Sequence, residues 1–149
     1  MTLADEIKQD HFPTVLGKAI LNILVTADRI SSATNATLKP FGVSKEQFNV
    51  LRILRGQYPK PSALQLISER MISKSSNATR LVEKLRMKGL VERCPCPTNR
   101  RKVDILITQK GLDLLDAIDA DDTLRTYWEG RITDEEAEEL SRILDKLRG

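Results

Sequence analysis

Apolar residues recur at steps of three and four along several stretches of the chain, which is the pattern of amphipathic helices. The first stretch runs from about Pro13 to Leu38, and Pro40 with Gly42 marks its end. We expect Pro13 to lie in the first turn of this helix, where its missing N–H is tolerated. At roughly 25 residues the helix is longer than average, so a small domain offers few packing partners along its length.

Short polar patterns predict where further helices begin. Capping boxes, which satisfy two free N–H groups at a helix start, are expected at Ser44, Ser62 and Thr133. Another helix is expected to begin at Ser73 and to end at Gly89, because glycine suits the left-handed position after a helix. The short helices that begin at Ser62 and Ser73 are joined by a tight turn and predict a helix-turn-helix.

The periodicity changes to that of β-strands after the helix-turn-helix. Residues 90–94 and 103–107 predict two short strands, and the polar segment 97–102 between them predicts a β-hairpin with a basic tip. Because Pro95 and Pro97 both lack an N–H on the same side, we expect the first strand to lie at an edge of its sheet.

Two helices are expected after the hairpin. One begins at Thr108 and continues to Tyr127 and Trp128, and Gly130 separates it from the last helix. The order α-α-α-α-β-β-α-α predicts a mainly α (α+β) fold, with a winged helix-turn-helix between N- and C-terminal helices. No linker or repeat interrupts residues 1–149, so we expect a single domain.

The charged residues are unevenly distributed along the chain. The chain has 24 basic and 21 acidic side chains, which gives a net charge of only +3. Residues 70–102 nevertheless contain ten Lys and Arg and only two Glu, whereas residues 103–149 contain thirteen acids and six bases. A short cationic block of this kind is typical of proteins that bind a polyanion, so we expect a phosphate-rich partner.

The position of the block indicates double-stranded DNA. The major groove admits an α-helix, so the second helix of a helix-turn-helix can read base edges there. The predicted contacts at the start of this helix and along it are Lys74, Ser75, Ser76, Asn77, Thr79, Arg80 and Lys84. The hairpin tip would reach the adjacent minor groove, where A·T-rich DNA concentrates negative potential. Its predicted contacts are Asn99, Arg100, Arg101 and Lys102.

The sequence contains few of the motifs that are typical of enzymes or of metal sites. The chain has one histidine, His11, and no nucleophile elbow, phosphate loop or cluster of metal ligands. Cys94 and Cys96 are too few for a structural zinc site, and we expect them to be ordinary reduced thiols. We therefore expect no enzyme activity, no cofactor and no metal.

The sequence also predicts no association with a membrane. Its longest apolar runs are far shorter than the ~20 residues that a membrane span needs. The first ten residues are acidic and lack the apolar region of a secretory signal, so we expect a cytoplasmic protein.

Several segments of the chain resemble the MarR family of bacterial winged-helix transcription regulators. The order and spacing of these segments carry the resemblance, which covers nearly the whole chain. They are Leu38–Val43, Gln47–Leu51, Thr79–Leu85, Lys88–Arg93, Asn99–Arg101 and Ile107–Gly111. Two positions differ from the family pattern: Asn99 replaces the usual wing aspartate that holds an arginine, and Ile72 replaces a frequent glycine in the helix-helix turn.

The resemblance implies a homodimer that binds a palindromic operator, as a repressor, with one recognition helix from each protomer. It implies dimerisation helices over residues 1–40 and 112–149, and a DNA-binding winged helix-turn-helix over residues 44–111. Family members commonly sense small aromatic compounds in a cleft between the dimer helices and the winged region. The residues that could border such a cleft here are His11, Phe12, Phe48 and Trp128.

Other interpretations remain open from the sequence. Phe48 could simply pack in the core, and Trp128 could fill a dimer interface. Some family members sense oxidants through a cysteine, which gives Cys94 and Cys96 a possible regulatory role. A winged helix can also serve only for protein–protein assembly, but such a module need not carry cations on both the recognition helix and the wing tip.

Overall fold

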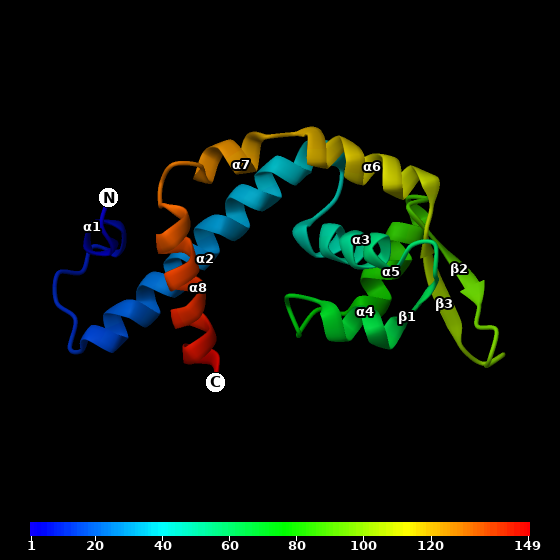
Figure 1. Cartoon of the computed structure of the whole chain (residues 1–149), viewed down its shortest axis with the longest axis horizontal. Coiled ribbons are helices and arrows are strands. Elements are labelled where there is room, and N and C mark those ends of the chain that lie inside the picture. The colour runs from blue at the N-terminus through cyan, green and yellow to red at the C-terminus, as the bar shows by residue number, and fades with distance from the viewer.

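Helices form most of the chain, and one small sheet interrupts them, in a computed structural model that describes residues 1–149. The mainly α fold with a winged helix-turn-helix confirms the fold predicted from the sequence (Figure 1). The elements are α1 (Leu3–Ile7), α2 (Val15–Leu38), the 3-10 helix η1 (Lys39–Phe41), α3 (Lys45–Gln57), β1 (Ser62–Ala63), α4 (Leu64–Arg70), α5 (Ala78–Met87), β2 (Val91–Pro95), β3 (Val103–Ile107), α6 (Gln109–Ala120), α7 (Thr123–Trp128) and α8 (Asp134–Arg148).

The hydrophobic core lies in the winged region, between α3, α4, α5, the sheet and α6. The last residue of α2 and the middle of α6 also contribute to it, which attaches these helices to the winged region. Removing apolar side chains from water is the main force that holds these elements together. The largest fully buried side chains are Leu38, Val50, Leu51, Ile67, Leu85, Ile107 and Leu115.

The sheet has three antiparallel strands in the order β1-β3-β2. Val91 pairs with Ile107 in the hairpin, and β2 lies at an edge, as the two prolines predicted. The predicted capping box at Ser62 is wrong. Ser62 belongs to β1 and pairs with Ile105 of β3, and the residue that precedes α4 is Ala63, which provides no side-chain cap. The Ser62 hydroxyl is buried and has no hydrogen-bond partner.

The other capping predictions have mixed outcomes. The boxes at Ser44 and Thr133 form as predicted, and Thr108 caps α6. Pro13 does not lie in the first turn of α2, because Thr14 caps the helix through the N–H of Gly17.

The start of α5 also differs from the prediction. Ser73 does not cap this helix, because the chain becomes helical only after Asn77. The Asn77 side-chain oxygen accepts a hydrogen bond from the N–H of Arg80 at 3.1 Å, which is the bond of an N-cap. Gly89 ends α5 with a φ of 73°. The N–H of Leu90 there bonds to the carbonyl of Leu85, as the predicted C-terminal stop requires.

Two further elements were not predicted from the sequence. α1 is a short helix capped by Thr2, whose capping box with Asp5 forms fully. The single helix predicted from Thr108 to Trp128 is divided into α6 and α7. The division occurs at Asp121 and Asp122, which end α6 and precede α7, and the Asp121 carboxylate accepts a hydrogen bond from the N–H of Thr123 across it.

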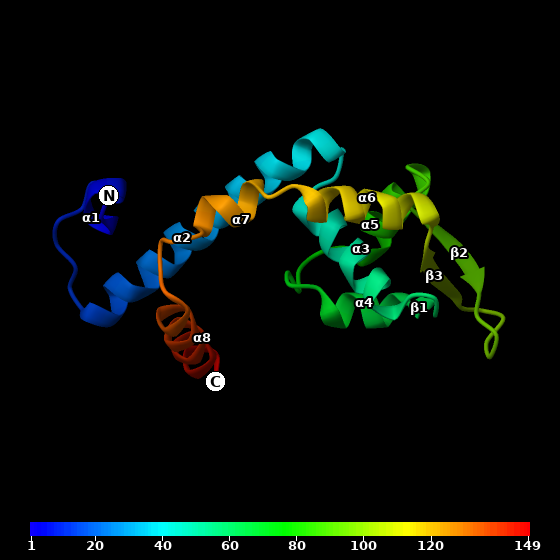
Figure 2. The ribbon, with the colours of Figure 1, turned by 45° about the horizontal axis from the view of Figure 1, so that its top comes forward.

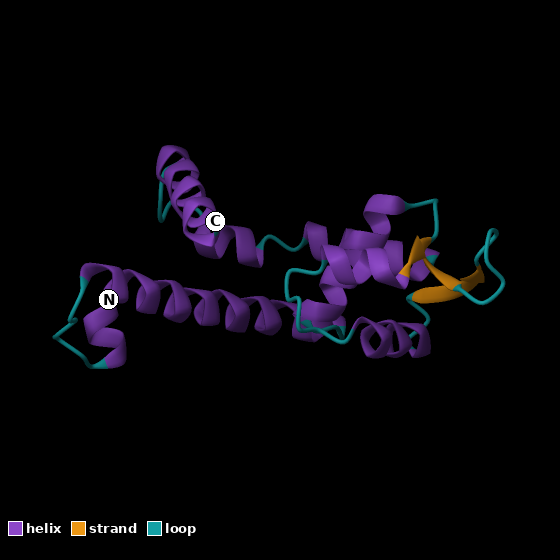
Figure 3. Cartoon of the chain, turned by 90° about the horizontal axis from the view of Figure 1, so that it is seen from below, coloured by secondary structure: helices purple, strands orange, loops and turns teal.

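The terminal helices extend away from the winged region, and the hairpin lies at the opposite end of the molecule (Figure 3). α2 buries only Leu38, and α8, which is angled away from α2 in Figure 2, buries no residue. Their apolar stripes remain in water: Leu24 is 60% exposed and Ile143 is 48% exposed. No helix has both the length and the apolar character needed to span a lipid bilayer.

Candidate nucleic-acid interface

α5 places its apolar and polar side chains on different faces, apart from Met87 at its end, which is 76% exposed. Ala78, Val82 and Leu85 are buried against the core. Thr79, Arg80 and Lys84 are the predicted contacts that lie on this helix, and all three are exposed. The polar face of α5 therefore remains open for a partner.

The first predicted contacts lie before α5 rather than in its N-terminal turn. Lys74, Ser75 and Ser76 belong to the connection between α4 and α5, residues 71–77, because the helix begins only at Ala78. Asn77 uses its side-chain oxygen to cap the helix, which leaves its amide NH₂ group for other partners.

The connection 71–77 is held by few hydrogen bonds. Lys74 donates from Nζ to the carbonyl of Glu69, and the hydroxyls of Ser73 and Ser75 lie 3.3 Å apart. No residue in it has a positive φ, so the turn does not need the glycine that Ile72 replaces.

The wing tip is a tight turn whose backbone is fixed by Asn99. Its side-chain oxygen accepts a bond from the N–H of Arg101 at 3.0 Å, and the N–H of Lys102 donates to the carbonyl of Asn99. Asn99 therefore holds the backbone of Arg101, and the guanidinium remains exposed with Arg100 beside it.

The cations of the basic block fall into two groups. Glu83 on α5 accepts from Arg86 at 2.6 Å and from Arg93 on β2 at 2.7 Å, and its hydrogen bonds with Arg86 lower the pKa of its carboxyl. None of the ion pairs in the structure involves the other group. Of these eight cations, Lys74 and Lys88 donate hydrogen bonds to oxygens of the protein, and Arg70 lies on α4. We call the remaining five, on α5 and on the wing tip, the free cations: Arg80, Lys84, Arg100, Arg101 and Lys102.

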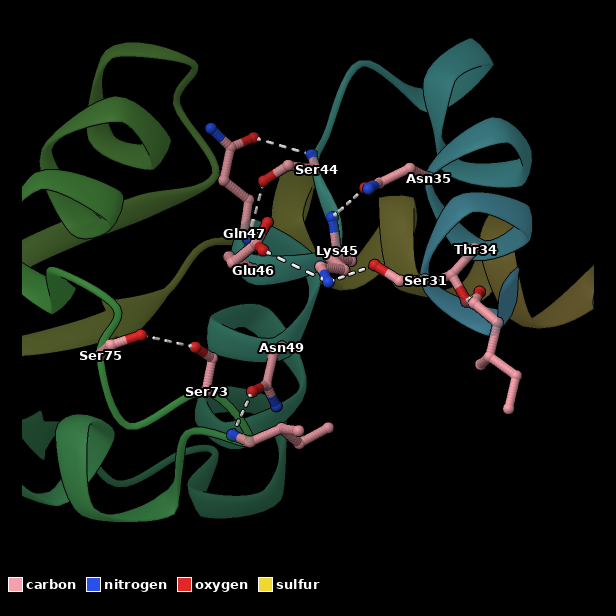
Figure 4. Close-up of polar contacts among 12 residues, drawn as sticks. Ser31, Thr34, Asn35, Ser44, Lys45, Glu46, Gln47, Asn49, Ser73 and Ser75 are labelled. Atoms are coloured by element: carbon pink, nitrogen blue, oxygen red, sulfur yellow. Dashed lines mark hydrogen bonds and ion pairs between the residues drawn. The ribbon is translucent and has the colours of Figure 1, made fainter. Parts of the chain in front are cut away.

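A cavity of about 690 Å³ lies between α2, α3 and the connection 71–77. Phe48 lines it, and the guanidinium of Arg52 lies 5.7 Å from the centre of the Phe48 ring. Lys45 donates to the hydroxyl of Ser31 and lies 3.8 Å from the carboxylate of Glu46 (Figure 4).

Sequence reasoning did not identify most residues of this cavity. Its walls come from two successive helices and from the connection 71–77, so no pattern within one helix joins Ser31, Asn49 and Ile72. The one available signal was the spacing of four residues between Phe48 and Arg52, which places both side chains on one face of a helix.

The other three residues proposed for an effector cleft lie away from this cavity. His11 and Phe12 precede α2, and Lys18 lies 5.3 Å from the centre of the Phe12 ring. Trp128 ends α7, where it packs edge-on against Tyr127 with ring centres 4.5 Å apart.

The two cysteines are free thiols in different surroundings. Burial raises the pKa of the Cys94 thiol, whereas a hydrogen bond with the Thr98 hydroxyl lowers the pKa of the Cys96 thiol. No group of three or more potential metal ligands lies together in the chain.

Comparisons with known proteins agree with this geometry. The family model described as "MarR family" matches residues 43–103. The chain is 34% identical over 89 residues to the HTH-type transcriptional regulator MhqR of Bacillus subtilis, a match that covers 60% of each protein. The match thus spans about three fifths of the length of this curated relative.

Solved structures match over more of the chain. The crystal structure of a MarR transcription factor from Planctomyces limnophilus has a TM-score of 0.69 and 30% identity, and the match covers 91% of this chain and 98% of that one. The organohalide-sensing regulator RdhR-CbdbA1625, in its 2,4-dichlorophenol-bound form, has a TM-score of 0.78 and 24% identity, covering 91% of this chain and 80% of that one. On these matches, the chain belongs to the MarR family of transcription regulators.

Proposed function

We propose that the chain is a sequence-specific DNA-binding repressor that acts as a homodimer on a palindromic operator and is released by a small aromatic effector. The observation that carries the proposal is the set of free cations on α5 and on the wing tip. A cation that has no acidic partner in the protein can pair with a phosphate without first breaking an ion pair.

The two parts of this surface suit two parts of a duplex. The exposed face of α5 presents Thr79 and Arg80 to base edges in the major groove. Arg100 and Arg101 on the wing tip suit the adjacent minor groove and its phosphates. A winged helix with these two surfaces contacts the major groove through its recognition helix and the adjacent minor groove through its wing.

The homodimer is supported by the open apolar faces of the terminal helices. Leu24 on α2 and Ile143 on α8 leave large apolar surfaces in water in a single chain, and a second copy would cover them. Two α5 helices would then bind half-sites about one DNA turn, ~34 Å, apart. Sedimentation at micromolar concentration tests this step, and a monomer would contradict it.

The effector is supported by the cavity beside Phe48. Its volume of about 690 Å³ falls in the range of small-molecule sites. An aromatic ring can stack on Phe48, and the hydroxyls of Ser31 and Thr34 can bond to polar substituents. The dimer can have its two recognition helices at the spacing that fits DNA or at another spacing. An effector that binds the second arrangement more tightly lowers the DNA affinity, at most by the ratio of its affinities for the two arrangements.

Selection of bound fragments from genomic DNA tests the proposal and identifies the operator. On that operator, Arg80→Ala should weaken binding by ~1–3 kcal/mol and relax the base preference. Arg86→Ala is the matched control, because Arg86 lies on the same helix but is already paired with Glu83. Unchanged affinity and preference for Arg80→Ala would contradict the assignment of α5.

The wing has its own test. Arg101→Ala should weaken binding mostly where A·T-rich DNA flanks the operator, because its narrow minor groove attracts arginine. An equal loss on G·C-rich flanks would indicate a simple phosphate contact.

If no fragment of genomic DNA is enriched at any salt concentration, the winged helix serves protein assembly instead.

A further inference from the structure

The cavity between α2 and α3 also touches the segment that leads into α5. Met71, Ile72 and Ser73 form part of its wall, and these residues begin the connection 71–77. The same connection carries Lys74 to Asn77, which are predicted DNA contacts. The cavity and the DNA-binding surface therefore share one short segment of backbone.

One side chain fixes this segment to the cavity wall. Asn49 on α3 lines the cavity, and its side-chain oxygen accepts a hydrogen bond from the N–H of Ile72 at 2.9 Å, drawn in Figure 4. The other hydrogen bonds of the connection stay within it or lead to α4 and α5. The bond that Asn49 accepts is thus the single hydrogen bond that joins the connection to an element other than the two helices that it links.

The side chains around this bond differ sharply in burial. Met71 is 2% exposed and belongs to the core, whereas the neighbouring Ile72 is 88% exposed. The packing of Met71 therefore fixes the start of the connection, and beyond it the backbone depends on Asn49. A molecule in the cavity would meet Asn49 and the exposed apolar side chain of Ile72 together.

We propose that Asn49 is a positioning residue, which holds the connection 71–77 in the conformation that binds DNA and transmits occupancy of the cavity to it. This rests on the function proposed above. An occupant that competes for the Asn49 oxygen, or that draws Ile72 inward, shifts the backbone of Lys74 to Asn77 without contacting DNA itself. A shift of the contact residues lowers operator affinity.

Two substitutions at Asn49 test the positioning role. Asn49→Ala removes the acceptor, so amide exchange of residues 71–77 should become faster and operator affinity should fall about 3- to 10-fold, the range that one hydrogen bond supplies. Asn49→Asp keeps an acceptor oxygen, so it should retain slow exchange and recover affinity relative to Asn49→Ala. Gln109→Ala is the control, because the Gln109 amide donates only to Asp113 of its own helix, α6, and does not line the cavity.

The transmission of occupancy can be tested without a ligand. Ala27 lines the cavity from α2, so Ala27→Phe places a ring inside it. Ala27→Phe should weaken operator binding. The fold-loss of affinity that it causes should be at least about two-fold smaller in the Asn49→Ala background, because the hydrogen bond between Asn49 and Ile72 is already absent there. Sedimentation confirms that each variant keeps the oligomeric state of the wild type.

The outcomes separate this proposal from the function on which it rests. If the wild type binds an operator but Asn49→Ala changes neither exchange nor affinity, Asn49 does not position the connection. If Ala27→Phe has the same effect in both backgrounds, occupancy is not transmitted through Asn49. If the wild type binds no DNA, the proposed function fails, and faster exchange in Asn49→Ala still shows whether Asn49 holds this segment.

Discussion

The salt dependence of DNA binding can be predicted from the free cations. Each protomer presents five of them, so a dimer presents ten. If each contacts a phosphate, the logarithm of affinity falls against the logarithm of salt concentration with a slope of about −9. Arg100→Ala removes one contact from each protomer, so the slope should become shallower by about 1.8.

The matched control carries the same change in charge. Arg86 belongs to the same cationic block, but Glu83 already holds it at 2.6 Å, so Arg86→Ala should leave the slope within about 0.5 of the wild type. Fluorescence anisotropy with a labelled operator, between ~50 and ~200 mM salt, measures all three proteins. The loss of affinity over that range should be about ten-fold smaller for Arg100→Ala than for the wild type.

Two results would refute this reasoning. An equal change of slope for Arg86→Ala would mean that local net charge, rather than the absence of an acidic partner, decides which cations contact DNA. A wild-type slope for Arg100→Ala would mean that the wing tip does not reach a phosphate.

Two further predictions concern packing and thiol chemistry. Gly111→Ala should destabilise the protein by about 1–2 kcal/mol in urea denaturation, because the new Cβ would overlap the carbonyl oxygen of Leu90. The cost of this overlap should exceed the stabilisation that alanine gives a helix relative to glycine. Gly56→Ala, which meets nothing within 4 Å, should instead stabilise it by about 0.5–1 kcal/mol, and a loss at both positions would contradict the packing argument. Iodoacetamide should modify Cys96 faster than Cys94 and from a lower pH, because the pKa of Cys96 is lowered and that of Cys94 is raised. Mass spectrometry measures both rates, and equal rates would contradict the assigned surroundings.

Sequence signals that act within four or five residues predicted the structure well. Ser44 and Thr133 cap helices because their partners are the N–H groups three residues later. Gly89 ends α5 because its backbone must adopt a positive φ, which few other residues do at low cost. In each case the interaction lies within the same segment, so distant parts of the chain do not alter it.

The same signals failed where a distant partner competed. Ser62 carries the same capping pattern as Ser44, but Ile105 pairs with its backbone and draws it into the sheet. Ser73 could have begun α5, but the connection instead passes the cavity, where Asn49 binds Ile72. No local pattern announces a partner more than twenty residues away.

The candidate site shows the same division. The residue counts located the cationic block, but only the structure showed that Glu83 forms ion pairs with Arg86 and Arg93, whereas the free cations have no acidic partner. Of the residues proposed for the effector cleft, Phe48 alone lines the cavity, because its walls come from two helices and a turn that meet only after folding.

The sequence alone determined most of the helices, the hairpin, the family resemblance and the concentration of positive charge. These follow from periodicity, short-range hydrogen bonds and residue counts, which need no knowledge of the fold. The tertiary structure decided which cations are free, where the cavity lies and how it meets the connection before α5. Those features depend on contacts between segments far apart in the chain, which packing of the core brings together.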